Sequence, residues 1–401
     1  QACADAKSGP APFLRNKLAQ ALVAVLQWEY PSAWPSFFHD LIGALPNGDG
    51  IVDMFCRILV AVDEDLVTLD IPRSQEESKL SMHIKDGMRE HSIADIADAW
   101  YKLLCVYPDK DPMLTVSVLQ TMTRYISWID INLVANTKFM SLLMSLLEAP
   151  HLGIRAAVAE CLTEVVSKRM DAVPKLQLVG SMGIVPRCEQ WVNGFPGAAD
   201  DEELLLRLAR LLATLATEIV DSVKRLENNV ISLAAVGLNI DDGAMLEVKQ
   251  GSELGSKQMS ALFPAIMAAF KSDVDEVALP LMPFMHAYVA RLKTLQKRNQ
   301  GQLDVQTTLH VRDILSGLAV CARYPSTSAC VNGGASGGAL EAAAAREEQA
   351  AVEEKRRDVF VLFKNISKIA FSESLGFVSG QLQRVIAAGG DGGGAGGGAR
   401  D

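Results

Sequence analysis

Apolar residues recur along most of the chain with the spacing of an α-helix. In the first clear segment, one helical face is formed by Leu14, Leu18, Leu22, Val25 and Leu26. These positions lie three or four residues apart, so their side chains meet on one side of a helix. The alternation of apolar and polar residues that is typical of β-strands is almost absent. The pattern therefore predicts an all-α protein.

Prolines and turn-forming residues divide this pattern into separate helices. Pro31 and Pro35 interrupt the first segment, and the cluster Pro46–Gly50 ends the second. A break is also expected near Ser92, inside a long helical stretch. Residues 230–240 fit either a loop or a short helix. The remaining expected helices cover residues 36–45, 51–67, 74–107, 112–128, 137–149, 151–169, 172–193, 200–227, 256–271, 274–295 and 303–323.

The predicted helices form pairs that recur about every 40 residues, which is the period of HEAT and armadillo units. In one such pair, Pro150 separates an amphipathic helix from a helix that carries the small residues Ala156, Ala157 and Ala159. Small side chains allow two helices to approach closely. Each unit has two faces to bury, so a single unit would not be stable alone. The predicted fold is an α-α superhelix, a HEAT-repeat solenoid.

Composition shifts divide the chain further. We expect a disordered lead at 1–12 and a HEAT-repeat solenoid of roughly six to eight helix pairs at 13–323. Residues 324–340 read as a flexible Gly/Ser-rich linker. Further helices, forming one more repeat, are expected at 341–388, and a disordered Gly-rich tail at 389–401. Because the chain opens on Gln1, we interpret it as incomplete at its front.

The chain is acidic, with 38 Lys and Arg against 48 Asp and Glu and a net charge of −10. Such a protein does not attract nucleic acid through its average field and would need local basic patches. Acidic residues concentrate at 53–77 and 200–203, and basic residues at 286–313 and 355–368. These runs are either ordinary solvated helix faces or segregated surfaces, with basic ones for phosphates and acidic ones for a basic protein.

The sequence predicts no catalytic, cofactor-binding or metal-binding residue. The seven cysteines form no Cys-x-x-Cys pair and are expected to be reduced core thiols of a protein in a reducing compartment. The six histidines show no His-Glu-x-x-His spacing and are expected at the surface or at helix ends. The chain also has no apolar run of the roughly 20 residues needed to span a bilayer, so we expect a soluble intracellular protein.

Specific strings point to a known family. They are Phe13–Gln20, Glu29–Phe38, Arg57–Asp63, Ile84–Glu90 and, as the most specific, the Tyr-Ile-Ser-Trp-Ile-Asp-containing segment Tyr125–Asn136. Together they resemble the N-terminal arch of the exportin-T family, the tRNA exportins of the importin-β (karyopherin) superfamily. The resemblance is strong over 13–169, weaker to about 295, and thins after 335, where an Ala/Gly-rich stretch takes over.

The resemblance implies a HEAT-repeat receptor that performs no chemistry. A receptor of this family binds tRNA together with Ran-GTP, passes nuclear pore proteins and shuttles between nucleus and cytoplasm. We expect a monomer without a cofactor or membrane insertion. No contact residue of the family can be assigned to this sequence one by one.

RNA helices are recognised mainly through their shape, phosphates and 2′-hydroxyls, so a few well-placed cations suffice. We hypothesise that the phosphate contacts include Lys168, Arg169, Lys293, Lys297 and Arg298. Trp128 could stack on a base, but its apolar neighbours Ile126, Ile129 and Ile131 favour a role in the core or between repeats.

Two other interpretations remain open from the sequence. The chain could belong to a karyopherin for a protein cargo, or it could be a general HEAT-repeat scaffold unrelated to transport. Binding of tRNA together with Ran-GTP separates the first interpretation from tRNA export. An enzyme is the least supported class, because no nucleophile–base pair, metal spacing or nucleotide loop is present.

Overall fold

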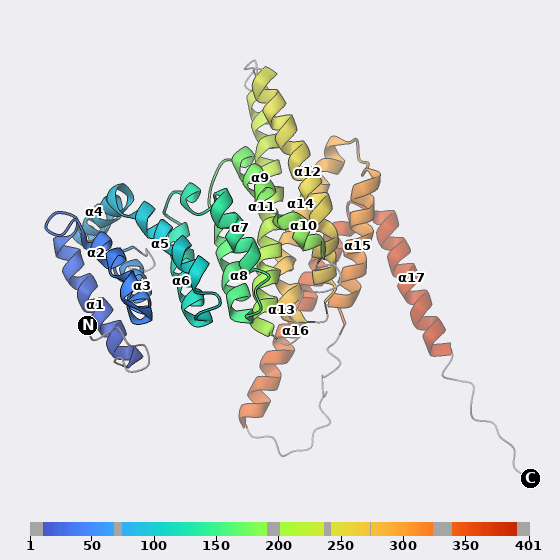
Figure 1. Ribbon diagram of the computed structural model, residues 1–401. Helices are drawn as coiled ribbons and strands as arrows, with labels where there is room; N and C mark the ends of the chain where they lie inside the picture. The colour runs from blue at the N-terminus through green and yellow to red at the C-terminus, as the bar shows by residue number, and fades with distance from the viewer. Residues whose placement is uncertain are drawn as a thin grey trace, which may run out of the picture. The chain divides into compact units, whose positions relative to one another are not determined.

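The computed structural model describes residues 11–67, 74–190, 201–235, 242–272, 274–323 and 339–390. Within these ranges the regular structure is helical and no strand occurs, which confirms the all-α prediction (Figure 1). The expectations for residues 1–10, 324–338 and 391–401 lie outside the described residues. The chain divides into two compact units, the first made of 1–184 and 197–215 and the second of 185–196 and 216–401.

Unit 1 is built from helix pairs. Its helices are α1 (Pro12–Glu29), α2 (Phe37–Gly43), α3 (Asp49–Val62), α4 (Gln75–His91), α5 (Ile93–Val106), α6 (Pro112–Ile126), α7 (Thr137–Leu146), α8 (Leu152–Ser167) and α9 (Ala172–Ser181). A single π-helical turn, η2 (Asp63–Val67), extends α3. The short turns η1 (Leu45–Asn47) and η3 (Ile131–Leu133) lie in connections.

The helices of unit 1 form two layers. In one layer α1 packs on α3, α3 on α6 and α6 on α8, and in the other α2 packs on α5 and α5 on α7. Contacts of α5 with α6 and of α7 with α8 join the layers. Figure 1 shows α3, α6 and α8 following one another in this order. This is the stacking of helix pairs that HEAT repeats require.

Capping residues explain where several of these helices begin. Ser74 forms a capping box with Glu77 at the start of α4. The Asp111 carboxylate accepts hydrogen bonds from two backbone N–H groups at the start of α6, and Pro112 occupies the first helical position. At Ser92 the backbone leaves helical geometry, so the expected long stretch is two helices, α4 and α5.

Large apolar side chains fill the space between the two layers. Trp100 of α5 is fully buried and meets Tyr125 of α6 edge-on, with the ring centroids 5.4 Å apart. The Tyr125 hydroxyl donates a hydrogen bond of 2.8 Å to the Leu59 carbonyl of α3. Helices α3, α5 and α6 are therefore joined at one point.

Unit 2 contains most of the later helices. They are α10 (Ile184–Glu189), the part of α11 (Glu202–Ala235) after residue 215, α12 (Asp242–Phe270), α13 (Asp275–Ala278), α14 (Met282–Arg298), α15 (Val305–Cys321), α16 (Ala339–Ser367) and α17 (Phe371–Gly390). Helix α12 packs on α15, α14 and α15 pack on α16, and α16 packs on α17. A Cβ atom at Gly317 would come within 2.6 Å of the Phe270 ring, so only glycine permits the α12–α15 contact at this point.

Several helix boundaries differ from the sequence prediction. Gly183 adopts a φ of 66°, a left-handed conformation that separates α9 from α10 in the expected 172–193 helix. Pro280 and Pro283 divide the expected 274–295 helix into α13, the 3-10 turn η5 (Leu279–Leu281) and α14. Helix α12 starts at Asp242, well before the expected residue 256.

The histidine and cysteine expectations meet one exception each. His310 is buried rather than exposed, stacks on the Phe263 ring at 3.7 Å and bonds the Tyr288 hydroxyl, and burial lowers its pKa. The described cysteines are free thiols, and all of them are buried except Cys105. Burial raises the pKa of the Cys56 and Cys161 thiols to about 12, so both stay protonated and unreactive at neutral pH.

Candidate nucleic-acid and protein interface

A polar groove runs along the layer of unit 1 that is formed by α1, α3, α6 and α8. It encloses about 680 Å³ and is lined by residues of α1, α3, α6 and α8 and of the start of α11. Four of its charged side chains are Asp53, Arg57, Arg124 and Arg207. Its mixed charge and open form suit polar contacts with a macromolecule better than burial of a small apolar ligand.

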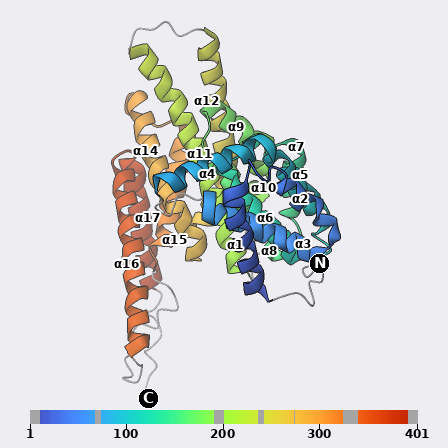
Figure 2. The same cartoon turned by 90° about the vertical axis from the view of Figure 1, so that its left-hand side faces the viewer.

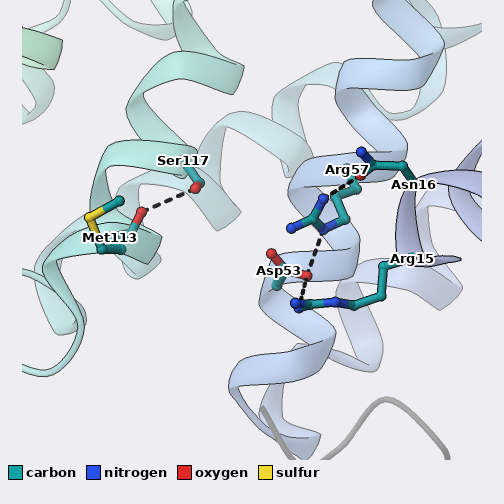
Figure 3. Close-up of polar contacts among 6 residues, drawn as sticks. All are labelled: Arg15, Asn16, Asp53, Arg57, Met113 and Ser117. Atoms are coloured by element: carbon teal, nitrogen blue, oxygen red, sulfur yellow. Dashed lines mark hydrogen bonds and ion pairs between the residues drawn. The ribbon is translucent and has the colours of Figure 1, made fainter. Parts of the chain in front are cut away.

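Ion pairs link neighbouring helices along this groove. Asp53 of α3 accepts from Arg15 of α1 at 2.5 Å and from Arg57 one turn away at 2.7 Å, and Arg57 also donates to Asn16. Figure 3 shows this network between α1 and α3, with Ser117 of α6 on the opposite side. The remaining pairs are Arg124 of α6 with Asp63 and Glu64 at 3.2 Å, and Arg207 of α11 with Glu160 of α8 at 2.5 Å. We name this set the arginine ladder.

Lys168, a predicted phosphate contact, lies at the end of α8 and is committed to the backbone. Its ammonium donates to the carbonyls of Ile126 at 2.7 Å, Ser127 at 3.2 Å and Ile129 at 2.5 Å. An ammonium has three protons, so these bonds occupy all of them. Desolvation lowers its pKa, although Asp130 opposes the shift. In this geometry Lys168 ties α8 to the end of α6.

The other predicted phosphate contacts differ in whether their side chains have a partner among the described residues. Arg169 in unit 1 and Lys293 and Lys297 in unit 2 are exposed, and none makes a hydrogen bond or ion pair with a described residue. Arg298 pairs with Glu227 at 2.8 Å, and Arg291 holds the same carboxylate with two hydrogen bonds. Two of the five residues lie in unit 1 and three in unit 2.

Trp128 is half-buried and lies just after the end of α6, next to α4. Its ring is 5.3 Å from that of Tyr125, and the cationic groups of Lys85 and Arg89 lie over it at 5.8 and 5.5 Å. Its indole nitrogen is buried. These contacts with Tyr125, Lys85 and Arg89 agree with the packing interpretation.

Lys175 was not among the predicted functional residues. It is fully buried in α9, and its ammonium donates to the carbonyl of Lys168 at 2.6 Å and to that of Val166. The signal in the sequence is its register, because Lys175 shares one helical face with Ala172, Leu176 and Val179. A lysine on an apolar face indicates a buried cation with carbonyl partners, so Lys168 and Lys175 together fasten the end of α8.

Sites of other kinds are missing from the described part of the chain. Within those ranges, no group of three or more His, Cys, Asp or Glu side chains is arranged to hold a metal ion. Of the helices described, none is long and apolar enough to cross a membrane.

Comparison with known proteins gives consistent matches. Residues 11–162 match the family model of exportin 1-like proteins. The Exportin-T of Arabidopsis thaliana is 31% identical over 380 residues, which is 94% of this chain and 35% of that protein. The Exportin-T of Oryza sativa subsp. japonica is 34% identical, covering 73% of this chain and 27% of that protein.

The human protein gives a similar result. The Exportin-T of Homo sapiens is 33% identical over 223 residues, covering 54% of this chain and 22% of that protein. The chain thus spans about a third of the length of the Arabidopsis relative and less of the others. Matches of this kind in plants and in an animal agree with the strings around Arg15, Lys85 and Trp128. The chain is a relative of the exportin-T proteins and carries an exportin 1-like region over residues 11–162.

Proposed function

We propose that the chain is part of a karyopherin-type nuclear export receptor that binds tRNA together with Ran-GTP. Such a receptor passes nuclear pore proteins, shuttles between nucleus and cytoplasm, acts as a monomer and performs no chemistry. The observation that carries the proposal is the match to Exportin-T along 94% of the chain. The paired helices of unit 1 support it, because stacked repeats offer long surfaces for large partners. The division of the chain into a solenoid, a linker and a further repeat is part of the same proposal.

The charge distribution agrees with this function. The net charge of −10 disfavours nonspecific association with RNA. A specific RNA must then be held by local cations that contact its phosphates. Of the predicted contacts, Arg169, Lys293 and Lys297 are free to do so. Lys168 and Arg298 would first have to leave the carbonyl and carboxylate partners described above, so we expect them to contribute less.

Neutralising the free cations should weaken tRNA binding through its salt dependence. In a variant with Arg169→Gln, Lys293→Gln and Lys297→Gln, we expect the slope of log K against log salt to fall by about 3, roughly one for each lost phosphate contact. Fluorescence anisotropy with labelled tRNA at several salt concentrations measures this slope. The matched control neutralises three exposed lysines elsewhere, Lys17, Lys79 and Lys249, and should retain the original slope. Equal slopes in all three proteins would remove these cations from the phosphate-binding set.

The function itself is tested by a coupled binding assay. The protein is mixed with labelled tRNA in the presence of Ran loaded with GTP, Ran loaded with GDP, or no Ran. Tighter tRNA binding with Ran-GTP alone supports the proposal, since two ligands that prefer the same state strengthen each other's binding. Ran-GTP-dependent capture of a protein without tRNA would instead indicate a karyopherin for a protein cargo. Binding of neither tRNA nor Ran would favour a general scaffold.

A further inference from the structure

The C-terminal half of α16 carries an exposed stripe that combines cations with an aromatic ring. Arg357, Phe360 and Lys364 are exposed and lie three or four residues apart, so they share one face of the helix, and the exposed Lys368 follows in the turn directly after α16. Phe360 stands 64% exposed. Apolar residues of the opposite face, including Val359, Leu362 and Ile366, are buried. We name the four exposed residues the α16 stripe.

Among the described residues, no carboxylate pairs with a cation of the stripe. The side chains of Arg357, Lys364 and Lys368 make no hydrogen bond or ion pair with a described residue. The neighbouring cations behave differently, since Lys355 pairs with Asp275 and Arg356 donates to the Ala322 carbonyl at 3.1 Å. Helix α16 thus uses its inward-facing cations for packing and leaves its outward-facing ones to solvent.

One further cation, Lys297 of α14, lies near the end of the stripe. Helices α14 and α16 pack together, and Gln296 of α14 donates a hydrogen bond of 2.6 Å to the carbonyl of Ile369, just after α16. Figure 2 shows α14, α16 and α17 side by side. Lys297 follows Gln296 and Lys368 precedes Ile369, so the two exposed lysines are next to the residues of this hydrogen bond, where α14 packs on α16. The basic surface therefore continues from α16 onto the end of α14.

The chemistry of this surface fits an unpaired stretch of RNA. Cations at successive turns follow a phosphate backbone, and an exposed aromatic face among them offers a platform for a base. The stripe is about 16 Å long from Arg357 to Lys368, at the helical rise per residue, which covers a few nucleotides. An acidic peptide would satisfy the cations but presents a planar group to Phe360 only where it carries an aromatic residue, whereas every nucleotide carries a base.

We propose that the α16 stripe binds an unpaired segment of RNA, with Arg357, Lys364 and Lys368 on phosphates and Phe360 stacked on a base. The proposal rests on the proposed tRNA-binding function and assigns it a second contact surface in unit 2. Paired RNA presents no free base face, so the stripe distinguishes single-stranded from duplex segments.

The test uses the full chain, tRNA, a ten-nucleotide single-stranded RNA and a duplex of the same sequence. Phe360→Ala should weaken binding of the single strand about tenfold and leave binding of the duplex unchanged. Neutralising Arg357, Lys364 and Lys368 to Gln should lower the salt slope for the single strand by about 2. Trp28→Ala, which removes an 81%-exposed aromatic from a stretch without Lys or Arg, is the control and should change neither value.

Each outcome decides between the two proposals. If the chain binds tRNA but the α16 variants bind single strands as wild type does, the stripe is refuted and the export function stands. If it binds the single strand through the stripe but does not bind tRNA in any condition with Ran, the export function is refuted and the stripe stands. Failure to bind either RNA refutes both. In a further outcome, polyglutamate displaces the RNA fully and Phe360→Ala has no effect. The surface would then bind through charge alone, and the proposed stacking of Phe360 on a base would be wrong.

Discussion

Replacing Trp100 with alanine should lower the unfolding free energy of unit 1 by about 4 kcal/mol, the largest loss expected from a single substitution in this fold. Trp100 is fully buried, and its ring meets Tyr125 edge-on at 5.4 Å. Truncation removes the indole and its contacts, leaves a cavity between α5 and α6, and ends an aromatic pair worth about 1 kcal/mol. Urea unfolding followed by circular dichroism measures the loss, and hydrogen exchange of α5 and α6 locates it.

The control for this prediction is another tryptophan of the same unit. Trp28→Ala deletes the same atoms from a side chain that is 81% exposed, so the urea concentration at which half of the variant is unfolded should stay near that of wild type. Trp100→Phe offers a graded test. The buried indole nitrogen of Trp100 has no hydrogen-bond partner among the described residues, so phenylalanine should retain most of the stability. Equal losses in the Trp100→Ala and Trp28→Ala variants would contradict the packing described above.

Replacing Lys168 with methionine should lower the stability of unit 1 by about 2 kcal/mol or more, since even one hydrogen bond from a charged donor contributes roughly that much. The change leaves three carbonyls, those of Ile126, Ser127 and Ile129, without their donor. It also removes a positive charge from the C-terminal end of α6, where the helix dipole favours cations. The same urea titration measures the effect, and methionine preserves most of the side chain's length.

Arg169→Met provides the matched control for Lys168→Met. Arg169 is the next residue, is exposed and makes no hydrogen bond or ion pair with a described residue, so its loss should leave stability unchanged. The effects on tRNA binding should be the reverse of those on stability. Arg169→Met should lower the slope of log K for tRNA against log salt, and Lys168→Met should leave this slope nearly unchanged. Unchanged stability together with a lower slope for Lys168→Met would return Lys168 to the phosphate contacts.

The helical layout could be predicted from the sequence because it depends on local signals. The period of the apolar residues, Pro112 at a helix start and the break at Ser92 each act within one or two helical turns. Helix α12 was expected to start too late because Gly251 and Gly255 weaken the apparent pattern over its first half. In the structure α12 continues through both glycines, which are buried.

The roles of individual cations could not be predicted in the same way. Lys168 meets carbonyl groups about 40 residues earlier in the chain, and no local pattern reveals such partners. The same limit applies to Arg298, whose carboxylate partner lies on α11. The basic run at 355–368 was visible in the sequence, but only the fold separates its inward-facing members, Lys355 and Arg356, from the outward-facing α16 stripe.

The arginine ladder should make the helix contacts of unit 1 sensitive to salt on one side of the unit. Arg15, Arg124 and Arg207 each connect two neighbouring helices of one layer through ion pairs that are partly open to water. Salt screens such pairs, whereas the aromatic and aliphatic contacts on the other side of the same helices do not depend on it. At high salt, the ion pairs between the helices of this layer should therefore weaken, while the apolar contacts behind them keep their strength. A charged partner in the groove would compete for the same arginines and so change the stiffness of the unit while it binds.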